Sequence, residues 1–378
     1  GRDRRPVHGP RPAHGIHPSL AIHPSHAIHA IHASHAAQPD QQGRTHMTPT
    51  STTFAEISNG LVYGAIAVYA LAMLAYAAET ARRTAATPPK NSERTQLLGA
   101  IGTSLTVLGF SLTALGALAR GLAAGRVPWG NMYEFVLVCA VAAGAAYLAF
   151  LTRQPVRAFG VWIVALILLA LGLAVTVLYT PAGALVPVLD SYWLVIHVTA
   201  AITGGGVFTV GAVASGLFLV RHRQERRAAV LVGASTAAEV DRNAGRDSEQ
   251  AGERAGERAG EPAGGRRGRY AATLPPSATL EQVAHTAHIF AFPIWTFAVI
   301  AGAIWAENSW GRYWGWDPKE TWAFITWVLY AAHLHAQATA GWRGVRASWF
   351  ALAGYAAFLF NFFGVNMWIT GLHSYAGI

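Results

Sequence analysis

Long apolar runs, each about 20 residues, constrain this chain more than any other feature of its sequence. A helix needs roughly 20 apolar residues to cross the ~30 Å hydrocarbon core of a membrane. Hydrophobic residues make up 53% of the chain and charged residues only 12%, which is too apolar for an ordinary soluble protein. We therefore predict an all-α, polytopic membrane helix bundle of about eight transmembrane helices, near residues 59–78, 97–119, 132–151, 158–179, 192–220, 288–305, 321–340 and 349–370.

The basic residues indicate which loops face the cytoplasm, because Lys and Arg in short loops are retained inside. The loops after the first, third, fifth and seventh predicted spans hold most of them: Arg82, Arg83, Lys90, Arg94, Arg153, Arg157, Arg221, Arg223, Arg226, Arg227, Arg343 and Arg346. Both termini and the loop 306–320 are then extracytoplasmic. The net charge of +9 follows largely from this topology and from flexible segments. No basic patch interleaved with aromatics on a soluble fold supports nucleic-acid binding.

Two segments have compositions that do not predict a fold. Residues 1–46 are a low-complexity, His-rich run that begins with Gly, so Met47 is an alternative start. We expect a disordered leader or a translated upstream region; a metal-binding tail is the other interpretation, since His-rich tracts bind metals. Residues 224–276 hold Ala-Gly-Glu-Arg repeats and few apolar side chains, which predicts a disordered cytoplasmic linker. The domains are then 47–223, with five spans, and 277–378, with three.

The single cysteine and the positions of the histidines narrow the kinds of site that the chain could contain. Cys139 is the only cysteine, so the chain has no Cys-x-x-Cys pair for thiol exchange, and we expect it to pack in the third span. His197 lies roughly 8 Å into the fifth span from its outer end, and His373 follows the last span. Two neutral imidazoles from different helices can take both axial positions of a haem iron. Interfacial histidines that bond only backbone or water are the alternative.

Tryptophan is concentrated beside these histidines. Six of the thirteen tryptophans lie between Trp305 and Trp327, mixed with Asp317, Lys319 and Glu320. Trp and Tyr also form belts at membrane surfaces, but a belt does not explain this local order. We predict that Trp310, Trp314 and Trp316 form a face for a flat ligand, while the ionic trio shapes the loop or contacts edge groups. A salt-bridged turn at a helix start is the alternative for that trio.

These residues resemble the CcsA family of cytochrome c biogenesis proteins, called CcsB in actinobacteria and ResC elsewhere. The resemblance covers about residues 59–378. It is carried by the tryptophan-rich segment Trp-Gly-Arg-Tyr-Trp-Gly-Trp-Asp-Pro-Lys-Glu at 310–320, with support from Pro-Trp-Gly-Asn-Met-Tyr-Glu at 128–134, Tyr-Trp-Leu-Val-Ile-His at 192–197 and Gly-Leu-His-Ser-Tyr at 371–375.

The resemblance implies roles for three histidines. His197 and His373 match the two external haem ligands, and His335 matches an intramembrane ligand whose partner histidine comes from a second subunit. His333 is a rival by proximity, but two residues along a helix turn a side chain by roughly 200°. His285 and His288 match no ligand of the family, and we expect them to be surface or packing residues.

The resemblance also implies a function: cytochrome c maturation by the system II pathway. The chain is expected in the plasma membrane, as a subunit of a cytochrome c haem lyase or synthase complex. It would handle haem b, which it presents outside and also exports. The implied partners are a CcsB/ResB-type membrane subunit, apocytochrome c, thiol-reducing proteins and membrane lipid. A b-type electron-transfer protein is the alternative, but it would normally pair its histidines at matched depths inside the bundle. A transporter for an unrelated solute leaves the outer histidines and indoles without a common purpose.

Overall fold

The computed structural model describes residues 49–85, 92–183, 187–244 and 265–373, and in these ranges the chain forms helices and no strand. The all-α prediction is therefore confirmed, while the predicted leader, 1–46, lies outside the described residues. The helices are α2 (Pro49–Arg83), α3 (Ser92–Ala124), α4 (Met132–Leu151), α5 (Gly160–Thr176), α6 (Tyr192–Ala244), α7 (Gly265–Thr273), α8 (Ser277–Trp310), α9 (Pro318–Ala338), α10 (Val345–Leu359) and α11 (Val365–Trp368). Short 3-10 turns cover Arg157–Phe159 and Pro187–Leu189, and a π-helical turn covers Phe360–Gly364.

Seven helical stretches of the described chain are long and apolar enough to cross a membrane, so the protein is a multi-pass membrane protein. They comprise α2, α3, α4, α5, α6, α8, and α10 continued through α11. The predicted span 321–340 overlaps α9, which does not belong to this set. The sequence of α9 includes Lys319, Glu320, two histidines and Gln337, and these polar residues make it less apolar than its neighbours. The orientation of the bundle stays a prediction.

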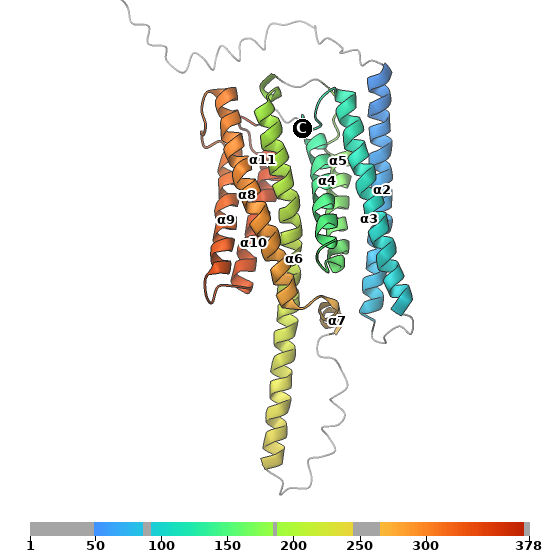
Figure 1. Cartoon of the computed structure of the whole chain (residues 1–378), viewed down its shortest axis with the longest axis vertical. Coiled ribbons are helices and arrows are strands. Elements are labelled where there is room, and N and C mark those ends of the chain that lie inside the picture. The colour runs from blue at the N-terminus through green and yellow to red at the C-terminus, as the bar shows by residue number, and fades with distance from the viewer. Residues whose placement is uncertain (1–48, 86–91, 184–186, 245–264, 374–378) are drawn as a thin grey trace, which may run out of the picture. The chain divides into compact units, whose positions relative to one another are not determined.

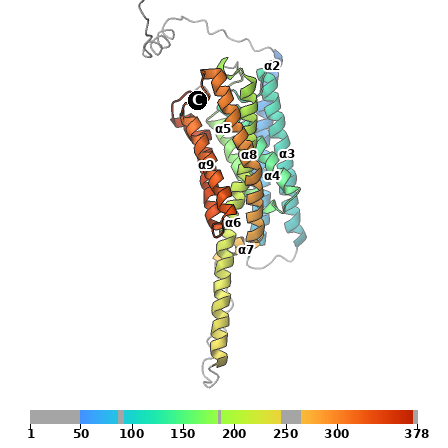
Figure 2. The same ribbon diagram turned by 60° about the vertical axis from the view of Figure 1, so that its left-hand side comes forward.

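Helix α6 packs against helices from both parts of the sequence. It contacts α4 on one side and α8 and α10 on the other, while α2 pairs with α3 and α9 pairs with α10 (Figure 1). The second half of α6 runs beyond the ends of the other helices, as the rotated view in Figure 2 also shows. The bundle therefore brings the two predicted domains together along α6.

The predicted linker, 224–276, differs in part from the structure. Residues 224–244 continue α6 and 265–273 form α7, while 245–264 lie outside the described residues. Arg221 pairs with Glu225 one turn along α6 at 2.8 Å, and Glu225 accepts a bond from the Ser277 amide at the start of α8 at 3.2 Å. Local charge pairing and good helix-forming residues such as alanine extend the helix where the low apolar content indicated disorder.

Local signals set the helix ends beside the tryptophan-rich loop. Helix α8 ends at Trp310 and is capped by Gly311, whose φ of 70° is left-handed and favours glycine. Helix α9 begins after Asp317, which accepts from the Lys319 amide, and Pro318 occupies the first turn, where its missing N–H is not needed. The loop between them is short because both ends are signalled within seven residues, from 311 to 317.

A buried ion-pair network fixes the turn before α4. Glu134 accepts from Nε of Arg120 at 3.1 Å, from a terminal guanidinium nitrogen of Arg126 at 2.7 Å and from the Gly130 amide at 2.9 Å. The side chains of Arg120 and Glu134 are fully buried. Asn131 also caps α4 by accepting from the Glu134 amide at 2.9 Å. The motif at 128–134 is therefore built around one carboxylate.

Candidate functional site

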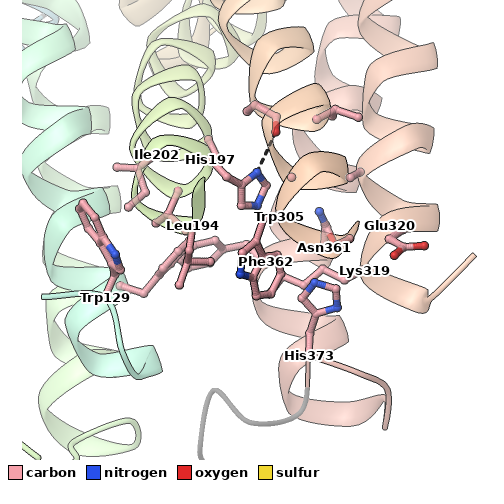
Figure 3. Close-up of a pocket in the computed structure, with 18 of the residues that line it drawn as sticks. Trp129, Leu194, His197, Ile202, Trp305, Lys319, Glu320, Asn361, Phe362 and His373 are labelled. Carbon is pink, nitrogen blue, oxygen red and sulfur yellow. Dashed lines mark hydrogen bonds between the residues drawn. The ribbon is translucent and has the colours of Figure 1, made fainter. Parts of the chain in front are cut away.

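A pocket opens beside the tryptophan-rich loop, between α4, α6, α8, α9 and the π-helical turn (Figure 3). Its empty volume is about 1240 Å³, including its open mouth. The lining is mainly apolar and aromatic, with a few polar side chains: Asn131, His197, Lys319, Glu320, Asn361, Asn366 and His373. A concave, apolar site with a few convergent polar groups suits a large, flat, amphiphilic ligand.

His197 enters this pocket from the second turn of α6. Its Nδ1 lies 2.7 Å from the Ala298 carbonyl oxygen of α8, shown as the dashed line in Figure 3. A carbonyl only accepts, so Nδ1 carries the hydrogen and Nε2 keeps its lone pair. Gly302 of α8 backs the ring, because a Cβ there would lie 2.7 Å from it. The backbone of α8 therefore fixes both the tautomer and the position of His197.

His373 reaches the same pocket from beyond the end of α11. Its Nδ1 lies 2.8 Å from Oδ2 of Asp317, and the Leu372 amide donates to Oδ1 of Asp317 at 2.8 Å. Gly371 permits this approach, since a Cβ there would come within 2.8 Å of the carboxylate. The Asp317 carboxylate therefore orients His373 with its Nδ1–H directed at the acid, which places the lone pair of the neutral ring on Nε2.

Trp305 contacts both histidines. Its ring centroid lies 6.3 Å from that of His197, with the planes 6° apart, and 5.7 Å from that of His373. Trp310 packs against Trp305 at 4.9 Å and against His373 at 5.0 Å. His197, His373 and Trp310 thus line one pocket, and Trp305 contacts both imidazoles.

The other two predicted tryptophans, Trp314 and Trp316, have different environments. Trp314 lines the pocket, whereas Trp316 is not part of the lining and is 65% exposed. Trp316 contacts Trp314 and Phe324 at 5.8 and 6.1 Å, edge-on, and has a φ of 56°, a strained conformation for a bulky residue. A role for Trp316 in binding a flat ligand stays a prediction.

The three ionic residues, Asp317, Lys319 and Glu320, make two kinds of contact. Asp317 and Glu320 form a capping box at the start of α9, and Glu320 also accepts from the Gly315 amide at 2.8 Å. Lys319 instead reaches into the pocket, where its Nζ donates to Oδ1 of Asn366 at 2.6 Å. The acids therefore shape the loop, whereas Lys319 bonds Asn366 in the pocket lining; a contact of Lys319 with an edge group of a ligand stays a prediction.

The protonation states suit metal ligation. Burial lowers the pKa of His373 below its ordinary value, although the hydrogen bond and charge of Asp317 oppose this. Burial alone would raise the pKa of Asp317, but hydrogen bonds from His373 and Leu372 outweigh it and hold that pKa below its usual range. Burial also lowers the pKa of Lys319 to about 8. Near neutral pH, His373 is therefore a neutral imidazole beside an ionised carboxylate.

The remaining predicted ligand, His335, lies outside the pocket. It is exposed on α9, whereas His333, two residues earlier, is fully buried and bonds the Ala347 carbonyl at 2.8 Å. His288 is also fully buried, with its ring 4.4 Å from that of His333. The described residues contain no group of three or more His, Cys, Asp or Glu side chains placed to hold a metal ion. His335 as an intramembrane haem ligand stays a prediction.

Several pocket residues were not singled out from the sequence. Trp129 had a signal, because it belongs to the motif at 128–134, but no role was given to it. Asn361 and Phe362 enter the pocket from the π-helical turn, a distortion that recurs at functional sites and has no sequence signature here. Cys139 also lines the pocket and is a free thiol, partly buried among apolar residues.

Comparison with known proteins assigns a family. A family described as Cytochrome C assembly protein matches residues 129–373, which include both histidines of the pocket. The cytochrome c biogenesis protein CcsA of Gloeobacter violaceus is 32% identical over 303 residues, covering 75% of this chain and 88% of that protein. CcsA of Synechococcus elongatus is 35% identical over 289 residues, covering 74% and 88%.

A solved structure shares the fold. The cytochrome c haem lyase CcmF superposes with a TM-score of 0.54 at 17% sequence identity, over 82% of this chain and 46% of that one. The chain therefore spans less than half the length of CcmF, and the likeness concerns the arrangement of helices. Because the family match and the CcsA relatives cover most of the sequence, this chain belongs to the cytochrome c assembly family and is a multi-pass membrane protein of cytochrome c maturation.

Proposed function

We propose that the chain binds haem b between His197 and His373 on the extracytoplasmic side and presents it for thioether attachment to apocytochrome c. The observation that supports this most directly is the shared geometry of the two imidazoles. Each has its Nδ1 directed at a fixed acceptor, Ala298 or Asp317, so each neutral ring carries its lone pair on Nε2, and both rings line one aromatic pocket. Bis-imidazole ligation of haem needs that arrangement.

The pocket holds the haem in position for the reaction and does not supply the nucleophile. The chain has a single cysteine, so the two thiols come from the Cys-x-x-Cys-His segment of the acceptor and are kept reduced by thiol-reducing proteins. Each thiol S–H adds across a vinyl group, with a new S–C bond and no net oxidation. Holding vinyls beside two thiols makes the encounter nearly intramolecular, an effect that is large when the geometry is right.

His335 supports a second part of the proposal, haem export with a CcsB/ResB-type subunit in the plasma membrane. Its exposure on α9 leaves the imidazole available to a second chain, whereas His333 is turned into the bundle. If His335 ligates haem together with a histidine of another subunit, it must lie in such an exposed position. Haem would meet His335 before it reaches the outer pocket.

The test uses the full chain, purified with and without its partner subunit. His197→Ala and His373→Ala should each change the haem absorption spectrum and abolish maturation of a reporter cytochrome c. His222→Ala is the control, because His222 stacks on Phe218 at 5.4 Å and does not line the pocket. Unchanged bound haem and unchanged maturation in both outer variants would refute the site. Retained haem that passes electrons but never reaches the reporter would favour a b-type electron-transfer protein.

A further inference from the structure

We propose that the bundle holds one anionic phospholipid at α5, with its phosphate between Arg83 and Arg157 and an acyl chain along the outer face of the helix. This site lies at the opposite end of the bundle from the histidine pocket. Helix α4 begins beside that pocket at Met132 and ends at Leu151, and Arg157 follows in the short connection to α5. The end with Arg157 also carries α7 and the extension of α6 (Figure 1). It is the end predicted to face the cytoplasm, where anionic lipids attract basic residues.

A polar pocket lies between the end of α2, the start of α5 and α7. Its empty volume is about 370 Å³, including its open mouth, which is within the range of small-ligand pockets. Its charged lining residues are Glu79, Arg83 and Arg157, and Tyr270 and Thr273 of α7 add hydroxyl groups. Arg83 and Arg157 are also the end residues of two stretches able to cross a membrane. The pocket therefore lies at the level of the lipid headgroups.

Two guanidinium groups share one carboxylate oxygen in this pocket. Oε1 of Glu79 accepts from Arg83 at 2.6 Å and from Arg157 at 3.0 Å. Within the described ranges, these are the only hydrogen bonds of the two guanidinium groups. The Glu79 side chain is 7% exposed, whereas those of Arg83 and Arg157 are 39% and 35% exposed. The pocket therefore has one positive charge in excess and guanidinium N–H groups on its open side, which suit the oxygens of a phosphate.

Hydrogen bonds from two other helices fix α7 beside this pocket. Nε1 of Trp162 on α5 donates to the Tyr270 hydroxyl at 2.8 Å, and Nε of Arg269 donates to the Thr84 carbonyl after α2 at 3.1 Å. Trp162 is 48% exposed, as an indole at a membrane interface often is. The wall formed by α7 is thus in place without a ligand, so that binding need not order it.

A shallow apolar groove continues from the pocket along α5. Ala158 and Val161 line the pocket, and Ala165, Leu168 and Gly172 line the groove. Their spacing of three and four residues places all five on one face of the helix. A Cβ at position 172 would meet nothing within 4 Å, so the groove is open there. From 161 to 172 it extends roughly 16 Å, about the depth of one leaflet.

The pocket and the groove together select the class of ligand. A free anion would use only the pocket, whereas a phospholipid places its phosphate in the pocket and a chain in the groove. The excess positive charge also selects among phospholipids, because the ammonium group of a choline headgroup would meet two arginines. An anionic lipid with an uncharged headgroup, such as phosphatidylglycerol, fits best.

Single-lipid binding to the delipidated full chain in detergent, followed by native mass spectrometry, tests the pocket. Phosphatidylglycerol should bind at least about fivefold more tightly than phosphatidylcholine with the same chains. Arg157→Gln should weaken phosphatidylglycerol binding about fivefold. Arg153→Gln is the matched control, because Arg153 is exposed in the same connection and does not line the pocket. Equal binding of the two lipids, or equal losses in the two variants, would overturn the site.

Glu79→Gln should change affinity in the opposite direction, which a damaged fold would not do. Without the carboxylate, both guanidinium groups are free for the phosphate, so phosphatidylglycerol should bind about fivefold more tightly. Glu93→Gln is the control, because Glu93 is exposed in the first turn of α3, just beyond the end of α2. Unchanged or weaker binding in Glu79→Gln would contradict a phosphate held by the two arginines.

Gly172→Leu tests the groove, since the added side chain excludes at least one methylene of the lipid and should weaken binding about fourfold. Gly60→Leu on α2, where a Cβ likewise meets nothing within 4 Å, should have no effect. Glycerol 1-phosphate, which lacks the chains, should bind at least about tenfold more weakly than phosphatidylglycerol. If Gly172→Leu binds the lipid normally, the groove is not part of the site. If glycerol 1-phosphate binds as tightly as the lipid, the pocket is a site for a free phosphate.

Discussion

His288 of α8 and His333 of α9 face each other inside the bundle, with their ring centroids 4.4 Å apart and their planes at 66°. Both nitrogens of His288 and Nε2 of His333 have no hydrogen-bond partner among the described residues. A buried polar atom left without a partner costs about 1–3 kcal/mol. The pair therefore weakens the interior locally, and Gly211 of α6 fits against it, since a Cβ there would lie 2.5 Å from Nε2 of His288.

Gly211→Ala should destabilise the protein by about 1–3 kcal/mol, because the added methyl group meets the His288 ring. In a His288→Ala background the cost should largely vanish, which gives a coupling of about 0.5–3 kcal/mol in a double-mutant cycle. Gly216→Ala, in the same helix, is the control: its Cβ meets nothing within 4 Å and should be neutral or stabilising. Thermal unfolding in detergent measures all four variants. Additive effects of the two substitutions on stability would contradict a direct contact between the residue at position 211 and the His288 ring.

Glu134→Ala should be among the most damaging substitutions, because it leaves Arg120 fully buried without its counter-charge. Breaking a buried ion pair in this way costs about 3–5 kcal/mol. Glu56→Ala, an exposed acid on α2, should change stability by no more than about 0.5 kcal/mol. The measurement is again thermal unfolding in detergent. A loss of under 1 kcal/mol in Glu134→Ala would mean that water reaches the arginine.

The apolar runs predicted the helices well, because length and hydropathy alone decide whether a segment can cross a membrane. They also predicted a helix at 321–340, where α9 lies, although its polar residues keep α9 out of the set of helices apolar enough to cross a membrane. They did not predict the extension of α6 over 224–244, where local helix formers continue the helix. There, hydropathy was a poor guide to helix formation.

The residue types of the candidate site were predictable from the sequence, but the groups that orient the two imidazoles were not. His197 and His373 stood out because both were predicted at the outer face beside a cluster of indoles, and because they match the two external haem ligands of the family that the chain resembles. Their orienting partners could not be predicted: one is a backbone carbonyl, which any residue supplies, and the other is an acid 56 positions away in sequence. Trp305 was likewise hidden, since only packing distinguishes it from the tryptophans around it.

Trp310 and Trp316 should differ sharply when they are replaced. Trp310→Leu removes a ring that packs on His373 and should lower haem affinity about 2- to 10-fold, in line with aromatic pair energies of about 0.5–1.5 kcal/mol. Trp316→Gly should leave haem affinity unchanged and relieve the strain of its positive φ. Haem titration with the two purified variants makes the comparison. A large loss in Trp316→Gly would restore Trp316 to the haem-binding face.

Lys319 should make stability depend on pH in the alkaline range. Its pKa is about 8 in the folded protein against an ordinary value of 10.5, so the unfolded chain binds more protons between these values. Stability therefore rises as pH increases from about 8 to 10.5, and the cost of burying the charge, up to about 3 kcal/mol, is fully present below pH 8. Lys319→Met removes this titration, so the difference in unfolding midpoint between wild type and variant should shrink as pH rises from 7 to 10. If the difference in unfolding midpoint stays constant over that range, the Lys319 ammonium is well solvated in the folded protein. Asn366 and water would then stabilise it as hydrogen-bond partners.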